Sequence, residues 1–297
     1  LRVDWDNEGC SRTVREHFRM VCEHSRTVCE QIGLICEQIS MIFKQNSMEK
    51  KLIRTRFSRA VGSYPQAAVV QRDVARRMAG LLHTYLPPAK CRNALEVGCG
   101  TGLFTRMLLR EVRPQHLMLN DICTNVQSYF TDILGADVSF CGGDAERVPF
   151  PAGQDLIGSC SALQWFNDPE AFFERCRRLL SEGGYLAFST FGKENMREVA
   201  SVTGTSLPYR SLEELSASLA QHYETVYSGE DLFRMSFPSP LEVLKHLKQT
   251  GVTGIRRQAW TRADLADFCR RYAEMFTQSD ATVSLTYHPI YMILKKK

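Results

Sequence analysis

The sequence predicts an α/β fold in which a mostly parallel sheet of seven strands is covered by helices on both faces. Short apolar runs typical of buried strands alternate with helical segments between residues 93 and 191. A glycine-rich loop joins the first of these strands to the first helix. The composition agrees, because 44% hydrophobic and 24% charged residues in a chain of 297 are the proportions of a globular protein.

Residues 48–90 come first in the predicted domain and read as a helical cap. A basic helical stretch runs from about Lys50 to Leu86, and the two prolines that follow it cannot continue a helix. The alternating region comes next. Strands are expected at 93–97, 116–120, 138–142, 155–162 and 185–191, and helices at 104–109, 126–134 and 168–180.

Residues 192–280 read as a mostly helical insertion after the fifth strand, on the side where a substrate would bind. Helices are expected near 193–202, 212–222, 241–250 and 262–276. One strand is expected near 223–237. A last strand, near 283–294, has the alternation that suits an antiparallel strand at the edge of the sheet.

Residues 1–47 contain a repeat of seven residues, marked by Val14, Val21, Val28, Ile35 and Ile42. A heptad repeat suggests a coiled coil, but the second apolar position of this repeat is largely polar. The alternative is a tandem DNA repeat translated by accident. We interpret residues 1–47 as an extension outside the catalytic fold, and residues 48–297 as the domain that carries the function.

Several classes of protein are excluded. No window approaches the ~18 to 20 continuous apolar residues of a membrane span, and no N-terminal stretch has the pattern of a signal peptide. We therefore expect a cytoplasmic protein that does not act at a membrane. The 11 cysteines form no Cys-x-x-Cys pair, so we expect no metal site.

The glycine-rich loop, Glu96-Val97-Gly98-Cys99-Gly100-Thr101-Gly102, lets the backbone come within contact distance of a ligand. A dinucleotide site and a plain tight turn are both alternatives for such a loop. Its spacing, however, lacks the third glycine of the G-x-G-x-x-G fingerprint and the G-K-[ST] of a phosphate loop.

Acidic residues end the next two strands. Asp121 lies about twenty residues beyond the loop, where a carboxylate can accept both hydroxyls of a ribose, and Ile122 follows it. The third strand leads into Gly143-Asp144-Ala145, which places a second carboxylate near an adenine amino group. Because open α/β sheets bind ligands at the carboxyl ends of their strands, these residues predict one nucleoside site.

This series resembles the pattern of class I S-adenosylmethionine-dependent methyltransferases over about residues 94–191. The resemblance implies a Rossmann-like fold and S-adenosyl-L-methionine as the cofactor. It also implies a role for Glu96 in positioning the loop and for Ser161 at the methionine end of the cofactor. The implied cofactor-binding residues are Glu96, Gly98, Gly100, Gly102, Asp121, Ile122, Asp144, Ala145 and Ser161.

From Met48 onward the chain resembles the malonyl-carrier-protein O-methyltransferases of biotin synthesis. The motifs that carry this resemblance are Arg56-Phe57-Ser58-Arg59-Ala60 with Ser63-Tyr64, Leu163-Gln164-Trp165, Phe188-Ser189-Thr190-Phe191, Asn195-Met196-Arg197-Glu198 and Leu207-Pro208-Tyr209. The resemblance implies methyl transfer to the free carboxylate of a malonyl thioester, giving the methyl ester that primes pimeloyl synthesis. The thioester would be carried by an acyl carrier protein or by coenzyme A.

A malonyl carboxylate is already ionised at neutral pH, so its methylation needs no catalytic base. It does need hydrogen-bond donors and a compensating charge in a dry pocket. Tyr64 and Gln164 are the predicted donors. Arg210 and Arg197 are the candidate arginines.

Basic residues between positions 50 and 77 suit an acidic partner such as a carrier protein. They are Lys50, Lys51, Arg54, Arg56, Arg59, Arg72, Arg76 and Arg77, against one acidic residue, Asp73. Phosphates of a nucleic acid would suit them too. The few aromatic residues there, and the absence of an Asn/Asp-Pro-Pro-Tyr/Phe series after the fourth strand, argue against a nucleic acid.

Two alternative functions stay open at this point. One is a methyltransferase of another small molecule, such as a carbon of a quinone precursor, which would require a general base. The other is a non-catalytic protein that binds the cofactor or forms oligomers through residues 1–47. For the catalytic reading we expect a monomer.

Overall fold

A computed structural model describes residues 50–87, 91–252 and 261–297, which all belong to one compact unit, Glu49–Lys297. The predicted heptad repeat of residues 1–47 lies outside the described residues. Within the described part of the chain, no helix is long and apolar enough to cross a membrane.

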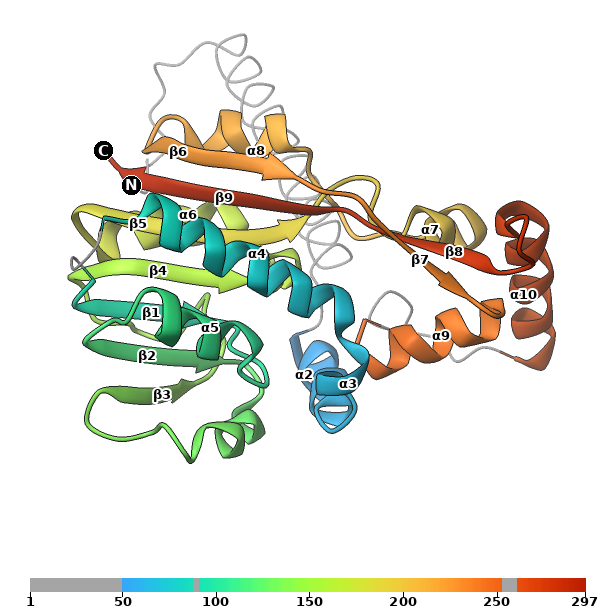
Figure 1. The fold of residues 1–297 in the computed structure, drawn as a ribbon, viewed down its shortest axis with the longest axis horizontal. Coiled ribbons are helices and arrows are strands. Elements are labelled where there is room, and N and C mark those ends of the chain that lie inside the picture. Colours follow the sequence, from blue (N-terminus) through green and yellow to red (C-terminus); the bar gives the residue numbers. More distant parts are fainter. Residues whose placement is uncertain (1–49, 88–90, 253–260) are drawn as a thin grey trace, which may run out of the picture. The chain divides into compact units, whose positions relative to one another are not determined.

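The unit is built on a seven-stranded sheet with the order β3-β2-β1-β4-β5-β9-β6 (Figure 1). Strands β1 to β5 are mutually parallel, whereas β9 is antiparallel to both of its neighbours. The bounds are β1 Asn93–Val97, β2 His116–Asp121, β3 Val138–Gly142, β4 Gln154–Cys160, β5 Leu180–Phe191, β6 Tyr223–Glu230 and β9 Pro289–Lys296. This confirms the predicted sheet, including its single antiparallel strand.

The last strand does not lie at the edge of the sheet, as the sequence predicted. β9 lies between β5 and β6, and its first six residues are all buried. The expected segment 283–294 is two strands, β8 (Val283–Tyr287) and β9, and the expected segment 223–237 is likewise β6 and β7 (Phe233–Phe237). β7 and β8 pair in a separate two-stranded sheet. Local alternation of apolar and polar residues gives no information about which strands pair. It therefore could not show that each of these two segments divides between the two sheets.

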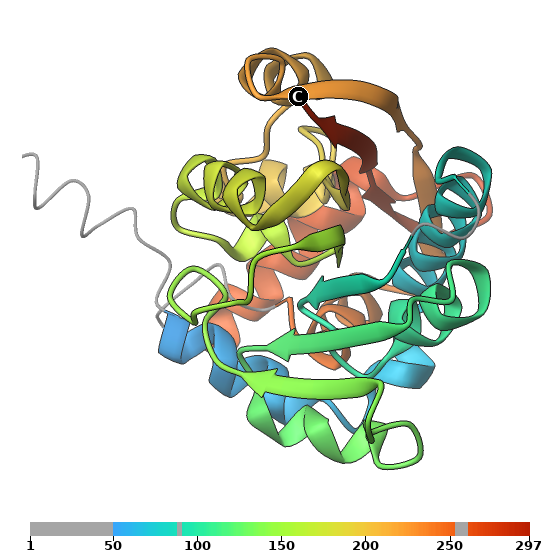
Figure 2. The ribbon, with the colours of Figure 1, turned by 90° about the vertical axis from the view of Figure 1, so that its left-hand side faces the viewer.

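Helices cover both faces of the large sheet. Figure 2 shows α4 (Val69–Tyr85) and α5 (Leu103–Glu111) on one face and α6 (Pro169–Leu179) on the other, with α8 (Leu212–Leu219) beside β6. The main apolar core includes buried residues of the sheet, of α6 and of α8, among them Ile157, Phe173, Phe188, Leu215 and Met292. This packing holds the carboxyl ends of the parallel strands in place.

Two predicted helices have other bounds. The expected helix 126–134 is a 3-10 helix, η1 (Thr124–Phe130), which buries Val126 and Phe130. These two buried side chains provide too little apolar contact to stabilise a helix as long as the predicted one. The expected helix at 50–86 is three helices, α2 (Lys50–Ala60), α3 (Tyr64–Ala67) and α4. Pro65 lies in the first turn of α3, because proline suits the first turn of a helix and not its interior.

The remaining described helices lie within the insertion after β5 or in the turn after β4. They are η2 (Leu163–Trp165), α7 (Arg197–Thr203), α9 (Pro240–Gln249) and α10 (Arg262–Phe276). The insertion thus contains α7, α8, α9 and α10 near the four predicted helices, and it also contributes β6 and β7. In Figure 1, α2, α3 and α9 lie beyond the carboxyl ends of the parallel strands, which is the side of the sheet where the sequence predicted the site.

Candidate functional site

A pocket opens at the carboxyl ends of β1, β2, β3 and β4. Its empty volume, counted with its open mouth, is about 850 Å³. We call it the glycine-loop pocket, because Gly98, Gly100 and Thr101 form part of its wall. The other lining residues used below are Lys50, Ile53, Phe57, Tyr64, Asn120, Asp121, Ile122, Asp144, Ala145, Ser161, Trp165 and Phe166.

The glycine loop has a backbone that favours glycine. Gly98 has φ +74°, and a Cβ atom there would lie 2.4 Å from the Cβ of Ala162. Gly100 has φ +52°, but a Cβ there would meet no heavy atom within 4 Å and would project into open space. The carbonyl of Asn120 accepts hydrogen bonds from the N–H groups of Gly98 (2.8 Å) and Cys99 (3.0 Å). The loop is therefore tied to the end of β2.

Asp121 also holds the loop. Its Oδ2 accepts a hydrogen bond from Gly100 N at 2.8 Å, and its Oδ1 accepts one from Cys123 N at 2.7 Å. Burial raises the pKa of Asp121, although these two N–H groups act in the opposite direction. Ile122 lies beside it in the pocket wall.

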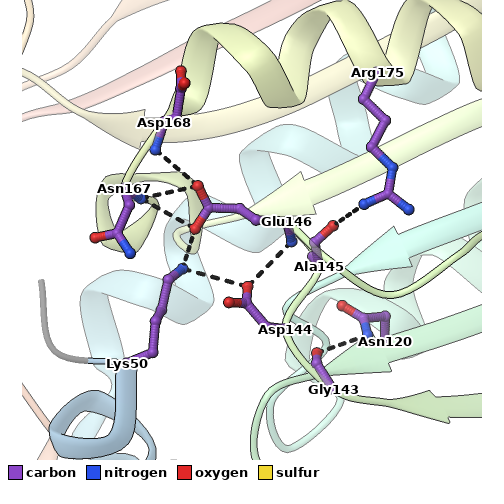
Figure 3. Close-up of polar contacts among 9 residues, drawn as sticks. All are labelled: Lys50, Asn120, Gly143, Asp144, Ala145, Glu146, Asn167, Asp168 and Arg175. Atoms are coloured by element: carbon purple, nitrogen blue, oxygen red, sulfur yellow. Dashed lines mark hydrogen bonds and ion pairs between the residues drawn. The ribbon is translucent and has the colours of Figure 1, made fainter. Parts of the chain in front are cut away.

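Asp144 and Ala145, in the turn after β3 (Figure 3), also line the pocket. Asp144 Oδ1 accepts a hydrogen bond from Glu146 N at 3.1 Å, which shapes the turn after β3. Asn120 supports the same turn, because its Nδ2 donates to the carbonyls of Cys141 (2.8 Å) and Gly143 (3.1 Å). Asn120 was not predicted as a site residue. It is a buried polar residue, and its position next to Asp121 was the one signal in the sequence that could have indicated it.

Two of the predicted cofactor residues, Gly102 and Glu96, are not among the described lining of the pocket. Gly102, with φ +87°, is the N-cap of α5 and packs against Phe130. Glu96 is buried in β1 with 1% of its surface exposed. Burial raises the pKa of Glu96 to about 8, with a further rise from Asp121 and an opposing contribution from Thr105. The role of Glu96 in positioning the loop stays a prediction.

A second, smaller pocket of about 350 Å³ adjoins the first. We call it the tyrosine pocket, after Tyr64, Tyr209 and Tyr287 in its wall. The two pockets share four lining residues, which are Phe57, Tyr64, Ser161 and Trp165. Ser161 has φ +58°, and its N–H donates to the carbonyl (3.0 Å) and hydroxyl (3.1 Å) of Ser189. The junction of the pockets is therefore anchored on β5.

The tyrosine pocket contains hydrogen-bond donors that stay protonated at neutral pH. Burial raises the pKa of Tyr209 to about 12, with an opposing contribution from Asn195, and burial also raises the pKa of Tyr64 well above its usual range. Asn195 Nδ2 donates to the Tyr209 hydroxyl at 2.8 Å, which leaves the hydrogen of that hydroxyl available to a ligand. Asn195, Tyr209 and Tyr287 were not predicted as site residues, although two of them belong to motifs that were noted.

The predicted catalytic residues are only partly brought together. Tyr64 and Gln164 both line the tyrosine pocket, and Gln164 Nε2 donates to the Ser161 carbonyl at 2.7 Å. Arg210 lines a third cavity, which shares Gln164, Phe191 and Tyr209 with the tyrosine pocket, and it forms an ion pair with Glu170. Arg197 pairs with Glu194 at 2.8 Å, and 44% of its side chain is exposed. Neither arginine is among the described lining of the tyrosine pocket.

The fold and the glycine-loop pocket together define a class I methyltransferase. Residues 95–188 match the family model described as a methyltransferase domain. A solved structure of a Bacillus halodurans protein assigned as a methyltransferase has a TM-score of 0.55 and 14% identity, with coverage of 74% of this chain and 98% of that one. The YcgJ protein of Bacillus subtilis has the same TM-score and identity, with coverage of 75% and 99%. Likeness at this identity shows the fold.

Relatives with higher identity give the family. Bacteroides thetaiotaomicron malonyl-[acyl-carrier protein] O-methyltransferase is 51% identical over 261 residues, covering 84% of this chain and 99% of that one. Proteins of the same name from Bacteroides fragilis and Haemophilus influenzae are 52% and 36% identical, each over 84% of this chain. The chain spans about half of the B. fragilis protein (51%) and 95% of the H. influenzae protein. The chain therefore belongs to the malonyl-[acyl-carrier protein] O-methyltransferase family, as the resemblance implied.

Proposed function

We propose that this methyltransferase uses S-adenosyl-L-methionine to methylate the free carboxylate of a malonyl thioester carried by an acyl carrier protein. The product would be the malonyl methyl ester that primes pimeloyl synthesis for biotin. The single observation that carries this proposal is the junction of two pockets at Ser161 and Tyr64. One pocket has glycine and carboxylate groups suited to a nucleoside, and the other has neutral donors suited to a carboxylate.

The residues of the glycine-loop pocket fit the methyl donor. Asp121 would accept the ribose hydroxyls, while Asp144 and Ala145 would contact the adenine. A Cβ on Gly100 would project into the open space of this pocket, so glycine leaves that space to a ligand. Thr101 Oγ1 is buried in the same wall and has no hydrogen-bond partner among the described residues. When bound, S-adenosyl-L-methionine supplies a methyl group activated by a positively charged sulfur.

The tyrosine pocket would hold the malonyl carboxylate. Tyr64 and Tyr209 are protonated donors, and Gln164 has a second N–H beyond the one given to Ser161. Hydrogen bonds to a charged group contribute roughly 1.5–3 kcal/mol each, so three such donors would orient the carboxylate firmly. The carboxylate is a nucleophile without losing a proton, so these residues bind and position it, and no residue acts as a base.

The lining of the tyrosine pocket disfavours the alternative of carbon methylation. That reaction would need a general base, and the described lining contains no histidine, aspartate or glutamate. The described lining also contains no arginine or lysine. Arg210 pairs with Glu170 and Arg197 pairs with Glu194, so we propose that neither arginine touches the carboxylate. Arg210 lines the neighbouring cavity, and we propose that it affects acceptor binding from there.

An acidic carrier protein fits the outer face of α2. Ile53 and Phe57 line the glycine-loop pocket on one side of this helix. Lys51, Arg54 and Arg59 are exposed on it. We propose that these charges attract the acidic carrier to the neighbourhood of the site, since complementary charge increases the rate of encounter.

A panel of acceptors tests the proposal. Purified protein is incubated with methyl-labelled S-adenosyl-L-methionine and, separately, with malonyl-carrier protein, malonyl-coenzyme A, acetyl-carrier protein or a quinone precursor. We expect label in malonyl thioesters, with the carrier protein preferred, and none in the acetyl thioester, which has no free carboxylate. Labelling of the acetyl thioester, or of the quinone precursor alone, would contradict the proposal.

A further inference from the structure

Helix α2 forms one wall of the glycine-loop pocket. Its residues Lys50, Ile53 and Phe57 all line the pocket, and their spacing places them on one face of the helix. Phe57 packs edge-on against Trp165, with ring centroids 5.3 Å apart. A ligand in this pocket would therefore lie between the sheet and α2.

Lys50, in the first turn of α2, reaches across to the turn after β3 (Figure 3). Its Nζ lies 2.5 Å from Glu146 Oε2 and 3.5 Å from Asp144 Oδ1. The same ammonium lies 4.7 Å from the centroid of the Phe166 ring, within the range of a cation–π contact. With 19% of the Lys50 side chain and 14% of the Glu146 side chain exposed, this pair is less screened by water than a surface pair.

Backbone N–H groups hold the carboxylate of Glu146 in place independently of Lys50. Both of its carboxylate oxygens lie 3.1 Å from Asn167 N, and Oε1 accepts a hydrogen bond from Asp168 N at 2.8 Å. Burial would raise the pKa of Glu146, but Lys50 and these N–H groups outweigh burial and lower it. Because Asp168 is the N-cap of α6, the carboxylate links the β3 turn to the segment after β4.

The other end of α2, together with Val61 just after it, is attached to η1 by neutral contacts. Ser58 Oγ donates to Asn125 Oδ1 at 3.3 Å, and Tyr129 OH donates to the Val61 carbonyl at 3.3 Å. The helix thus spans the pocket, with a charged contact at its first turn and weaker neutral contacts at its end. The charged contact lies at Asp144, the residue proposed to meet the adenine.

We propose that Lys50 and Glu146 form a latch that keeps the first turn of α2 against the adenine side of the glycine-loop pocket and slows release of the methyl donor. This inference rests on the proposed use of S-adenosyl-L-methionine. Glu146 is the fixed half of the latch and Lys50 is the half that moves with α2. Both are positioning residues, because they act through the placement of α2.

The first test measures the dissociation rate of S-adenosylhomocysteine by stopped-flow fluorescence. We expect Lys50→Met and Glu146→Gln each to release it about five- to tenfold faster, the change that loss of an ion pair of roughly 1 kcal/mol would give. Lys50→Arg should stay within about twofold of the wild type. The double variant should be no faster than the faster single variant, because both changes break one contact. Independent, multiplicative effects would overturn the latch.

A matched control is Lys245→Met, which breaks an ion pair of the same length, 2.5 Å to Glu242, on the exposed surface of α9. It should leave the dissociation rate unchanged. An equal increase in this control would show a general effect of surface charge and would overturn the proposal.

The second test is hydrogen exchange of residues 50–60 without any ligand. These amides should exchange several-fold faster in Lys50→Met and Glu146→Gln than in the wild type or in Lys245→Met. Unchanged exchange would overturn the latch whatever the ligand. If the wild type binds neither S-adenosyl-L-methionine nor S-adenosylhomocysteine, the assignment of the methyl donor fails, and the exchange experiment still decides whether the latch exists.

Discussion

The carboxylate of Asp121 accepts a hydrogen bond from the backbone N–H of Gly100 at 2.8 Å, across 21 residues of sequence. The acid that ends β2 therefore shapes the loop that follows β1. Its second oxygen is engaged by Cys123 N at 2.7 Å. The residue that we propose to meet the ribose thus also fixes the backbone of the glycine loop, so both roles would be lost together when the carboxylate is removed.

Asp121→Ala should weaken binding of S-adenosyl-L-methionine by at least 10- to 100-fold, since a hydrogen bond to a charged group contributes about 1.5–3 kcal/mol. Asp121→Asn should be little better, because its amide cannot accept hydrogen bonds from both Gly100 and Cys123. Titration calorimetry gives the affinity. Asp137→Ala, at a side chain 77% exposed, is the control that should bind normally. An Asp121→Asn affinity equal to that of the wild type would refute the role of the carboxylate.

Glu96→Gln should change how stability depends on pH. The pKa of Glu96 is about 8 in the folded protein against an ordinary 4.5, so the folded state holds this proton more tightly than the unfolded state. The stability associated with it is complete below pH 4.5 and falls as pH rises toward 8. Glutamine does not ionise, so the Glu96→Gln variant does not lose this stability as pH rises. The free energy of unfolding of the variant relative to wild type should therefore rise between pH 5 and 8, by up to ~1.4 kcal/mol per pH unit.

Urea unfolding of both proteins across that range measures the slope. Wild-type and Glu96→Gln curves that run parallel from pH 5 to 8 would mean that Glu96 is ionised in the folded protein.

The grouping of residues in the glycine-loop pocket was predictable because these residues lie at strand ends. Gly98, Gly100, Asp121 and Asp144 follow three successive parallel strands, and parallel strands bring their carboxyl ends to one edge. The arrangement of β9 between β5 and β6 was not predictable in this way, because local alternation does not determine strand order.

The tyrosine pocket was harder to predict, because it is assembled from distant segments. Tyr287 comes from β8, whereas Tyr209 and Asn195 come from the insertion and meet only when the chain folds back. The ion pair between Arg210 and Glu170 joins residues 40 apart in sequence, and no motif indicated it. The Lys50–Glu146 pair is of the same kind, since neither residue has a signal of its own.

Tyr209→Phe should lower kcat for malonyl-carrier protein by about tenfold, the effect of losing one hydrogen bond of roughly 1.5 kcal/mol to a charged group. The affinity for S-adenosyl-L-methionine should not change, because Tyr209 does not line the glycine-loop pocket. Steady-state kinetics and calorimetry separate the two.

For the wild type, kcat should be flat from about pH 6 to 8, because no base titrates there. A kcat that falls with one ionisation in this range would indicate a catalytic base.

Residues 48–297 are proposed to be the whole methyltransferase domain. A protein that begins at Met48 should fold and methylate malonyl-carrier protein at the full rate, because the relatives of known family align over 84% of the chain. Thermal unfolding and kinetics compare it with the full chain. Insolubility, or loss of an oligomer that the full chain forms, would show that the heptad repeat is a structural element.

The central claim is that the methyl group goes to the oxygen of the malonyl carboxylate, and its most direct test is the position of the methyl group in the product. The protein is incubated with ¹³C-methyl S-adenosyl-L-methionine and malonyl-carrier protein, and the product is examined by NMR before and after mild alkali. We predict the signal of a methyl ester, which alkali converts to labelled methanol. A methyl signal on carbon that survives alkali would contradict the account.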